Sequence, residues 1–600
     1  MKLHKILVLA LVAAYSLTAA SVTEKFSALS KVEAERAAAI YNGPRSRVSM
    51  WIWSDKYTYQ PGEAATFKAT IKTNGDLYPY TFVVYRQNNQ TGAKTYMTAT
   101  GSASAEPTDF GGNKLSDGFQ AARLADLTKQ TVLALPIPEE YGMHTAVVEL
   151  RDYTGTRILK SAYMKLGVVR ATTVLSGDIT ADRTLTSDTR WEVRGVVNVR
   201  NNATLTIEPG TFVIGQPGSS PPSVLLVTRD GKINASGTKS RPIIMTSSQP
   251  FGQRKRGDWG GLIMLGKAPI NVPANAAGGT NTAGTFFIEG LVANDNFLYG
   301  GSDANHNCGT LRYVRVEYAG TILSPNNETN SFTWGGCGKG TVAEHLQAIY
   351  GADDSFEWFG GTMDAKWLVG GLGADDYVDF QLGWTGRLQY GLFYQNADAR
   401  GNRGMEGDNS EFSPTATPFS NPTMYNLTFI GSGSPGFDES NAPGIFLRRG
   451  ARGTFNNMVV SNFFSGAVDI SDAATQAEAT AGNVKMNGIL MWKNNLGGVA
   501  PSAPADTRDG NITSAFTRTY AGSNTNAAQL MVQDPLFVRP FEWSDPDWSG
   551  QFGSPLFRAG WVAAPDDGFF DQTAKFIGGI GDDDWTLEWT SWLVEGDIAP

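Results

Sequence analysis

Carboxylate side chains gather in three short stretches near the middle of the chain, at spacings that could support chemistry. The stretches are GADDSFEWFGG from residue 351, GADDYVDF from residue 373 and GMEGDN from residue 404. They supply Asp353, Asp354, Glu357, Asp375, Asp376, Asp379, Glu406 and Asp408. Because the stretches follow one another at 22 and roughly 30 residues, a fold of stacked coils would bring the carboxylates onto one face. Close unpaired carboxylates repel one another, so such a face needs bound cations or raised pKa values.

Calcium is the cation that this pattern favours. Ca²⁺ takes about six to eight oxygen ligands from carboxylates and carbonyls in loose geometry, and neighbouring glycines would let backbone carbonyls approach. The carboxylates of all three stretches are therefore predicted ligands of a structural Ca²⁺ site. The residues leave two alternatives open: a catalytic carboxylate pair, and a turn face that is solvated or paired with Lys and Arg.

Tryptophans accompany the acidic stretches. Trp358, Trp367 and Trp384 all lie within about thirty residues of Asp354. An aromatic face beside a carboxylate suits a sugar ring, because the ring can stack while the carboxylate accepts hydrogen bonds from hydroxyls. We therefore predict that these three side chains stack against a saccharide. The alternative is that they fill or stack the coils of the fold.

The elements that position these residues begin at about residue 170, where short apolar runs alternate with Gly, Asn, Asp and Thr. The runs NATLTIEPGTFVIG (202–215) and SVLLVTRDGKINASGTKSRPIIMTS (223–247) resemble the first coils of right-handed parallel β-helix proteins. In that fold each coil makes two or three short strands with apolar residues pointing inward, while small and polar residues occupy the corners. The sequence therefore predicts an all-β protein built around such a solenoid.

Recurrent spacings support the solenoid and predict its period. Asn426, Asn457 and Asn487 are 31 and 30 residues apart, and each is followed by an apolar strand. Tyr318 and Tyr350 lie 32 residues apart in two segments that align with each other. A fixed period is the signature of a repeat architecture. We expect coils of about 30–32 residues, with the three asparagine amides hydrogen-bonded in a ladder like those of stacked β-strands.

The remainder of the chain divides by composition. A positive head, an apolar run of signal-peptide length and small residues before Ser21 predict a secretory signal cleaved near Ala20. Alternating strands with a Pro-Gly turn, including DKYTYQPGE, resemble immunoglobulin-like and macroglobulin-like modules. The predicted parts are a signal peptide at 1–20, a helical lead-in at 21–46, an immunoglobulin-like β-sandwich at 47–168, the β-helix at 170–575 and a C-terminal cap over the last coil at 576–600.

The two cysteines fit an oxidising compartment. Cys308 and Cys337 are 29 residues apart, close to one predicted coil. Neighbouring coils could therefore bring them together, and we predict a disulfide rather than two buried free thiols.

The middle and end of the chain resemble a largely uncharacterised group of secreted bacterial β-helix surface proteins. The motifs that carry the resemblance are GDWGGLIMLGKAPIN (257–271), IEGL (288–291), LRYVRVEYAG (311–320), the stretch 353–380 and DDWTLEWT (583–590). The resemblance implies the fold and a place at the cell surface. It assigns no activity.

A β-helix also suggests polysaccharide processing by analogy. The pair Asp353 and Asp354 could imitate the acid and base of polygalacturonase-like hydrolases. Lys366 and Arg448 are the best basic candidates for a lyase that uses Ca²⁺ and a basic residue. The histidine and Arg-x-Lys partners of the hydrolases have no identifiable counterpart, and no Ser-His-Asp or Cys-His arrangement is present.

These observations favour a non-catalytic extracellular or cell-surface protein: an adhesin, a matrix protein or a surface-layer component that contacts polysaccharide or other cell-surface components. A polysaccharide lyase or glycoside hydrolase is the alternative. The net charge of −9 argues against nucleic acid as a partner, and no run in the mature chain is long enough to span a membrane. The sequence leaves the oligomeric state open.

Overall fold

The computed structural model describes most of the chain from Val48 onwards. The described residues are 48–73, 81–97, 103–104, 107, 128–151, 158–324, 327–395, 403–432, 443–464, 466–494, 530–558 and 560–592. The predicted signal peptide (1–20) and helical lead-in (21–46) lie outside them. No helix in these ranges is long and apolar enough to cross a membrane.

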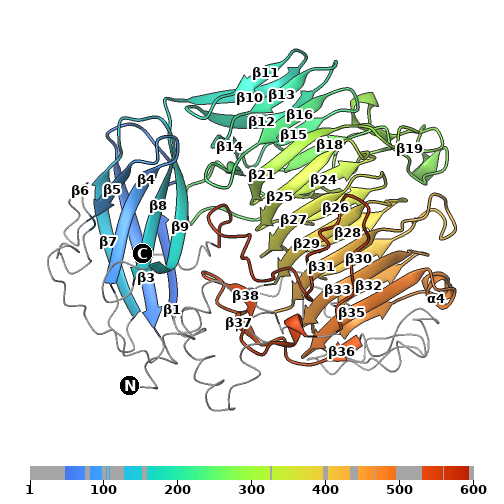
Figure 1. Cartoon of the computed structure of the whole chain (residues 1–600). Helices are drawn as coiled ribbons and strands as arrows, with labels where there is room; N and C mark the ends of the chain where they lie inside the picture. The colour runs from blue at the N-terminus through green and yellow to red at the C-terminus, as the bar shows by residue number, and fades with distance from the viewer. Residues whose placement is uncertain are drawn as a thin grey trace, which may run out of the picture.

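The N-terminal unit consists of two mainly antiparallel sheets that face each other (Figure 1). One sheet has the order β1 (Val48–Ser54), β3 (Ala64–Thr73), β7 (Thr128–Pro136). The other has the order β2 (Thr58–Tyr59), β9 (Ile158–Val168), β8 (Gly142–Arg151), β4 (Thr81–Asn88), β5 (Lys94–Met97), β6 (Ala103–Ser104). Side chains such as Phe67, Val148 and Leu166 fill one shared core. The assignment of this unit to the immunoglobulin-like class stays a prediction.

The main body is a stack of parallel strands, which confirms the predicted parallel β-helix (Figure 1). Its first half contains β10 (Thr172–Ile179), β11 (Arg183–Leu185), β12 (Arg190–Val199), β13 (Thr204–Ile207), β14 (Phe212–Gly215), β15 (Val224–Val227), β16 (Lys232–Ser236), β17 (Ile243–Ser247), β18 (Leu262–Leu265) and β21 (Gly309–Glu317). Its second half contains β24 (Phe332–Gly335), β25 (Val342–Ile349), β26 (Phe356–Phe359), β27 (Ala365–Gly371), β28 (Val378–Gln381), β29 (Arg387–Tyr394), β30 (Met405–Asp408), β31 (Thr423–Ile430), β32 (Pro443–Arg448), β33 (Gly453–Ser461), β34 (Gly466–Ile470), β35 (Val484–Trp492) and β36 (Leu530–Val532). The right-handed sense of the winding stays a prediction.

Two columns of strands run through the second half of the β-helix. The short strands β24, β26, β28, β30, β32 and β34 stack on one side, and the long strands β21, β25, β27, β29, β31, β33 and β35 stack on another. The coil length is not constant: 24, 22 and 27 residues separate the equivalent positions Phe332, Phe356, Val378 and Met405. The predicted period of 30–32 residues therefore holds only for part of the stack, because corner loops differ in length.

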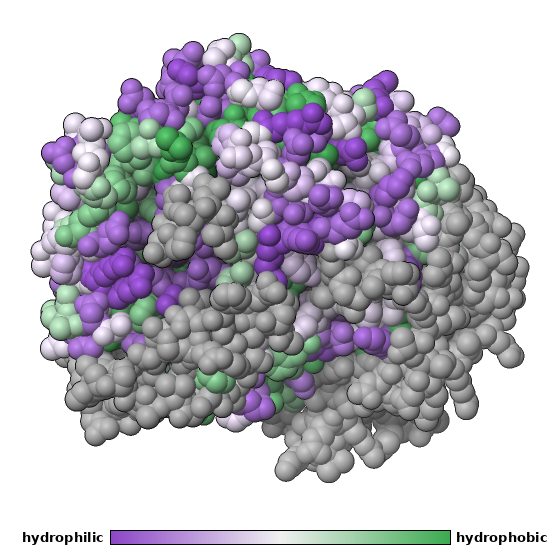
Figure 2. All heavy atoms as spheres, turned by 180° about the vertical axis from the view of Figure 1, so that it is seen from behind, coloured by the Kyte–Doolittle hydropathy of each residue, from purple (hydrophilic) through white to green (hydrophobic). Residues whose placement is uncertain are grey.

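The remaining elements are short and lie outside these columns. They are η1 (Ala276–Gly278), β19 (Thr285–Phe287), η2 (Asp295–Phe297), β20 (Leu298–Gly300), β22 (Ile322–Ser324), β23 (Asn327–Glu328), α4 (Ala473–Thr480), β37 (Phe537–Arg539), β38 (Asp547–Gly550) and η5 (Pro555–Phe557). From behind, the surface shows hydrophilic residues interspersed with smaller hydrophobic areas (Figure 2).

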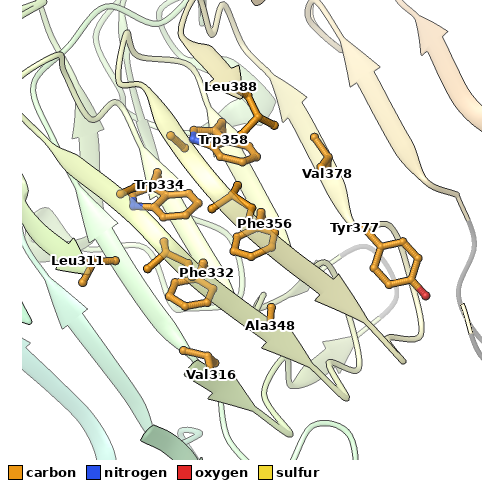
Figure 3. Packing of buried hydrophobic residues seen from close by; sticks show 14 of the residues in the cluster. Leu311, Val316, Phe332, Trp334, Ala348, Phe356, Trp358, Tyr377, Val378 and Leu388 are labelled. Atoms are coloured by element: carbon orange, nitrogen blue, oxygen red, sulfur yellow. The ribbon is translucent and has the colours of Figure 1, made fainter. Parts of the chain in front are cut away.

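Aromatic rings fill the interior of the coils in stacks (Figure 3). Trp334, Trp358 and Trp384 stack with ring centroids 5.0 and 4.7 Å apart, and Phe332 stacks on Phe356 at 5.3 Å. Equivalent residues of adjacent parallel strands are about 4.8 Å apart, which is the spacing that offset-stacked rings prefer. The fold therefore repeats a favourable contact from coil to coil.

A second aromatic stack follows one corner of the long strands, where the backbone turns through the left-handed region. Tyr313, His345, Trp367 and Tyr390 each have a positive φ, and their rings stack in sequence at 4.2, 4.4 and 5.8 Å. The left-handed conformation strains residues other than Gly, Asn and Asp, so the stacking must help to hold it.

The asparagine ladder differs from its prediction. Asn426 and Asn457 continue the left-handed corner at equivalent positions, but Asn487 pairs with Asn456 and is one residue out of register. The amides of Asn426 and Asn457 donate to the carbonyls of Phe576 and Val562 instead of to each other. The predicted coil-to-coil ladder of these three residues is therefore wrong. Those two amides anchor the C-terminal segment.

The C-terminal segment runs back along the long strands (Figure 1). Gly578 donates to the Asn457 carbonyl, and Ser591 exchanges hydrogen bonds with the Gln347 side chain. The Trp589 ring packs edge-on against Tyr313 and His345. Residues 576–592 thus contact the flank of earlier coils, in place of the predicted cap over the last coil.

The predicted disulfide is confirmed. Cys308 and Cys337 are bonded, with Cα atoms 5.9 Å apart, and both are fully buried. The bond links the start of β21 to the turn after β24.

We expect Trp358→Ala to lower the free energy of unfolding by about 3–5 kcal/mol, the range for large buried aromatics replaced by Ala. The ring is fully buried between two others, so the cavity cannot be filled by solvent. Val292→Ala, at a position 87% exposed, is the matched control and should leave stability within about 0.5 kcal/mol. Urea unfolding followed by circular dichroism measures both, and a loss below about 1 kcal/mol for Trp358→Ala contradicts the packing described.

Candidate metal centre

The acidic strands lie in register in the short-strand column. Glu357 in β26 pairs with Asp379 in β28, and Asp379 pairs with Glu406 in β30. Their neighbours Phe356 and Trp358 point into the core, so the alternation of a strand turns Glu357 outward (Figure 3). The register places three carboxylates side by side on the outer face.

A second column precedes these strands and forms a hydrogen-bonded ladder. The side chain of Asn330 accepts from the Asp354 backbone N–H at 3.2 Å, that of Asp354 from the Asp376 N–H at 3.0 Å, and that of Asp376 from the Arg403 N–H at 2.7 Å. Each side chain therefore satisfies a backbone donor of the next coil. Asp354 and Asp376 consequently serve the stacking of the coils in addition to any role with a ligand.

The two columns, together with Asp353 and Asp375, form three groups of converging carboxylates, in each of which one oxygen per residue lies within 4.8 Å of the others. The groups are Asp353, Asp354 and Asp375; Asp354, Glu357 and Asp379; and Asp376, Asp379 and Glu406. The structure thus brings together seven of the eight predicted ligands. We call this surface the acidic face.

One further carboxylate joins the acidic face from outside the predicted stretches. Glu289, from the segment between β18 and β21, hydrogen-bonds to Glu357 and Asn330. Gln381 also donates to Glu357 at 2.9 Å. Sequence reasoning missed Glu289 as a ligand candidate because it belongs to a segment that folds over the face from about seventy residues away.

Burial and mutual repulsion raise the pKa values across the acidic face. Burial is the larger cause, and it raises the pKa of Glu289 and Glu406 to about 8 and that of Asp376 to about 6. Burial, and then the neighbouring Asp379, likewise raise the pKa of Asp354 well above its usual range. Burial and Glu406 do the same for Asp379. Ionising these groups together is therefore unfavourable unless a cation is present.

Arginines neutralise one end of the acidic face. Arg403 forms ion pairs with Asp376 and Glu406, and Arg448 pairs with Glu406 and Asp408. Arg449 gives Asp408 a second partner at 2.8 Å. Asp408, a predicted metal ligand, is therefore an ion-pair partner, and it belongs to none of the three carboxylate groups.

The predicted basic candidates for catalysis do not act as free bases at this face. Carboxylates raise the pKa of Arg448 despite its burial, so the guanidinium stays protonated. Lys366 lies on β27, in the other column of strands, where its ammonium donates to the Phe569 carbonyl. The prediction that these residues serve the acidic face as catalytic bases is therefore wrong.

The three tryptophans predicted to stack against a saccharide do not lie on the acidic face. Trp358 and Trp384 are fully buried in the interior stack, so they cannot meet a ligand, and that prediction is wrong. Trp367 is half-buried in the corner stack between His345 and Tyr390. It lies on β27 with Lys366, away from the short strands that carry the carboxylates.

The acidic face is covered. Ile270, Ile288 and Tyr299 from the segment between β18 and β21 pack with Phe359 and Leu382 of the short-strand column in one apolar cluster. This lid covers the short-strand column beside Phe359 and Leu382.

The carboxylates of the acidic face differ in exposure. Asp354 is 6% exposed, Glu357 3% and Glu406 5%, whereas Asp353, Asp375 and Asp379 are half-buried. The acidic face is therefore largely buried, and each of its three carboxylate groups keeps at least one half-buried member.

Parallel coils in register and a cluster of converging carboxylates define a β-helix protein with a candidate site for a hard cation. The family model of the pectate-lyase-like beta helix domain matches residues 177–545. The chain therefore belongs to the family of pectate-lyase-like β-helix domain proteins.

The other comparisons add little. No curated protein matches the chain. A CARDB domain from Pyrococcus furiosus, solved in complex with di-metal ions, is 12% identical, covers 20% of this chain and 92% of its own, and has a TM-score of 0.13. A cycloisomaltooligosaccharide glucanotransferase from Paenibacillus sp., complexed with cycloisomaltoheptaose, is 13% identical, covers 22% of this chain and 16% of its own, and also has a TM-score of 0.13. Likeness at this level carries no argument about fold or function.

In metal-free buffer the raised pKa values predict a loss of stability as pH rises. A carboxyl whose pKa is higher in the folded state contributes stability that is complete below its unfolded pKa and lost as pH passes its folded pKa. For Glu289 and Glu406 that window runs from 4.5 to about 8. Thermal unfolding in the presence of a chelator should show a melting temperature that falls as the pH rises through this window.

The variant Glu289→Gln tests whether the acidic face causes this pH-dependent loss of stability, because it keeps the hydrogen bonds of residue 289 and removes one ionisable group. Its melting temperature should decline less with pH than that of the wild type, whereas the exposed control Glu139→Gln should follow the wild type. Parallel declines in all three proteins would contradict the assignment of the effect to the acidic face.

Proposed function

We propose that this protein is a secreted extracellular or cell-surface β-helix protein with a structural or binding role, in which Ca²⁺ occupies the acidic face and stabilises the coils. The observation that carries the proposal is the convergence of largely buried carboxylates, whose oxygens lie within 4.8 Å of one another in each group, next to an apolar lid. A buried site of this kind suits an ion that holds the fold together better than one that meets a polymer.

The donor set suits a hard cation. The three carboxylate groups offer only oxygen, which favours Ca²⁺ or Mg²⁺ over softer metals. The Oδ1 atom of Asp379 is buried and has no hydrogen-bond partner among the described residues. A buried oxygen of this kind is costly unless it binds something. Asp354, Glu357 and Asp379 would hold the ion. Calcium is the favoured ion because it accepts more oxygen ligands, in looser geometry, than the near-octahedral magnesium.

The ion would supply positive charge where the arginines do not reach. Arg403, Arg448 and Arg449 neutralise Glu406 and Asp408 at one end of the face. Asp354, Glu357 and Asp379 have no ion pair to Lys or Arg among the described residues. An ion held between them would join β26 to β28 and let both coils keep their ionised carboxylates.

The proposed location and partners follow from the sequence. A signal peptide cleaved near Ala20 would send the chain out of the cytoplasm, where the disulfide is stable and calcium is plentiful. A rigid solenoid offers a long surface with few mobile parts, which suits an adhesin, matrix protein or surface-layer component. Extracellular polysaccharide and other cell-surface components are the proposed partners.

A polysaccharide lyase or hydrolase is the second candidate, and the family match is the observation that favours it. Fold alone does not assign activity. An enzyme at the acidic face would need the lid to open and a basic residue other than the ion-paired Arg448.

Calcium should stabilise the protein through the acidic face. At a concentration about one hundred times its Kd, Ca²⁺ should raise the free energy of unfolding by about 2.7 kcal/mol, and a chelator should reverse this. Asp379→Asn should remove most of the calcium effect, because it deletes a ligand charge. Asp566→Asn, at an exposed position on the C-terminal segment, should keep it.

Differential scanning calorimetry with added calcium or chelator measures these changes. Identical melting curves for the wild type in both conditions would overturn the calcium proposal.

Enzymatic activity is tested by incubation with a panel of acidic polysaccharides, with and without chelator. We expect neither unsaturated products, detected by ultraviolet absorbance, nor new reducing ends, because most of the acidic face is buried and Arg448 is held in ion pairs. Chelator-sensitive product formation that is lost in Asp379→Asn would establish the lyase instead.

A further inference from the structure

A cleft of about 240 Å³ lies between the N-terminal unit and the C-terminal part of the chain. Strands β1 and β9 of the N-terminal unit line it on one side, and residues 544–547 and 584–592 line it on the other. Figure 1 shows β1 and β9 on the side of the N-terminal unit that faces the β-helix. The volume is below the range of about 300–1,000 Å³ that holds drug-sized ligands, so the cleft admits only a slender ligand.

The charges that line the cleft balance one another. Lys160 forms an ion pair with Asp545, and Arg539 contacts Asp545 at 3.3 Å and Asp547 at 3.7 Å. The complete set of charged lining residues is Lys160, Lys165, Arg315, Arg539, Asp545, Asp547, Asp584 and Glu588. Because basic and acidic side chains are equally numerous, the lining selects neither an anion nor a cation. It suits an uncharged ligand that offers both donors and acceptors.

The cleft meets β9 at its edge. Eight consecutive residues, Ile158–Lys165, line the cleft. Because successive side chains of a strand point to opposite faces, a cleft over one face would contact alternate residues only. β9 pairs with β8 over most of its length, but its other edge pairs with β2 only at Gly167 and Val168. Among the described residues, no strand therefore covers the edge of β9 that faces the cleft.

Alternation determines which peptide groups point into the cleft. Gly167 donates its N–H to the Tyr57 carbonyl, on the side of β9 away from β8. The N–H and C=O of one residue in an antiparallel strand point to the same side, and that side alternates along the strand. The peptide groups of Lys165, Tyr163 and Ser161 therefore point away from β8 as well. None of these groups has a hydrogen-bond partner among the described residues.

The edge of β1 in the same cleft is, by contrast, already covered. The Met50 N–H donates to the Asp545 carboxylate at 3.0 Å, and the Lys160 ammonium donates to the Val48 carbonyl at 3.1 Å. Side chains there take the place of a neighbouring strand, and covering an edge is one way in which natural sheets avoid unwanted pairing. The edge of β9 is thus the part of the cleft that can still accept a strand.

A row of unpaired peptide groups is specific for one class of ligand. Buried N–H and C=O groups without partners are unfavourable, and Lys165 is only 3% exposed. Another extended polypeptide offers acceptors and donors in the matching alternation. From Ser161 to Lys165 the edge spans about 13 Å at about 3.3 Å per residue, which is enough to pair with about five residues of a strand. Several peptide-binding domains recognise their ligands by such strand addition.

We propose that the free edge of β9 binds an extended segment of a partner polypeptide, which joins the sheet as a new strand beside Ser161, Tyr163 and Lys165. Trp51 and Trp592 line the same cleft and would contact the side chains of that strand. The proposal goes beyond the calcium-stabilised role of the β-helix, because it assigns a separate interaction site, on the N-terminal unit, and a class of partner.

The test is calorimetric titration with the peptide acetyl-Thr-Val-Thr-Val-Thr-amide, whose β-branched residues favour an extended conformation. The matched control is the same peptide with every amide N-methylated, which leaves its side chains unchanged and removes its donors. We expect the unmodified peptide to bind at least about tenfold more tightly than the control. Equal affinity of the two peptides, or no binding of the unmodified peptide at about 1 mM, would overturn the proposal.

A proline variant locates the site. Ser161→Pro removes an N–H that points to the cleft and makes no bond to β8, and proline is tolerated at such positions of edge strands. Ser161→Ala keeps the N–H and is the matched control. We expect Ser161→Pro to lose at least about tenfold in peptide affinity and Ser161→Ala to bind as the wild type does. Equal affinities of the two variants would contradict pairing at β9. If Ser161→Pro fails to fold, the two peptides on the wild type still decide.

The strand-binding site and the calcium site fail separately. Every titration is repeated with a chelator present. Peptide binding that persists with the chelator supports the edge of β9 even if calcium has no effect on stability. Absent peptide binding in a protein that calcium stabilises refutes the edge of β9 alone.

Discussion

A parallel β-helix places each residue about 4.8 Å from its equivalent in the next coil, so that the chemistry of one position is repeated along a column. For apolar groups the repetition is favourable, as in the register pairs Trp334–Trp358 and Phe332–Phe356, whose rings stack. For backbone donors it is useful, because Asp354 accepts from the coil that carries Asp376. For ionised groups it is costly, since Coulomb repulsion at this distance is strong wherever water is excluded.

Along the acidic face the repulsion between carboxylates is reduced in two ways: by ion pairs with arginine at one end, and by raised pKa values further along. At one end arginines from β32 and from the turn before β30 pair with Glu406 and Asp408. Further along, Glu357 and Asp379 have amide and carboxyl neighbours but no cation of their own among the described residues. There burial and the neighbouring carboxylates raise the pKa values of both groups. A protein kept in that state by protons alone would weaken as pH rises, whereas a bound divalent ion would relieve both the repulsion and the burial.

The fold and the presence of the acidic face could be predicted from the sequence, because both depend on local patterns. Alternating apolar runs with polar corners define coils, and Asp353 to Glu406 recur near the coil length. The cover over the face could not be predicted in this way. Glu289 and the apolar residues around it lie in an insertion whose path depends on tertiary contacts. The stacking role predicted for Trp358 failed for a similar reason. The sequence shows that side chains alternate between the two sides of a strand, but it does not show which side faces the interior.

The C-terminal segment was misplaced for a related reason. Its Trp-rich and acidic composition suits a cover, but composition does not say which surface is covered. The residues that fix its course are the corner amides of Asn426 and Asn457, whose equivalence could be predicted and whose partners could not. By returning along the coils the segment contacts Gln347 and Tyr313 on the long strands, which its composition alone could not specify.

The central claim is that the acidic face holds a divalent cation as part of the folded structure. Crystals of the protein grown with calcium and measured for anomalous scattering test it most directly. We predict a single strong peak among the carboxylates of Asp354, Glu357 and Asp379, with oxygens at about 2.3–2.6 Å. Carboxyl groups bonded directly to one another through shared protons, with no peak between them in the presence of calcium, would contradict it.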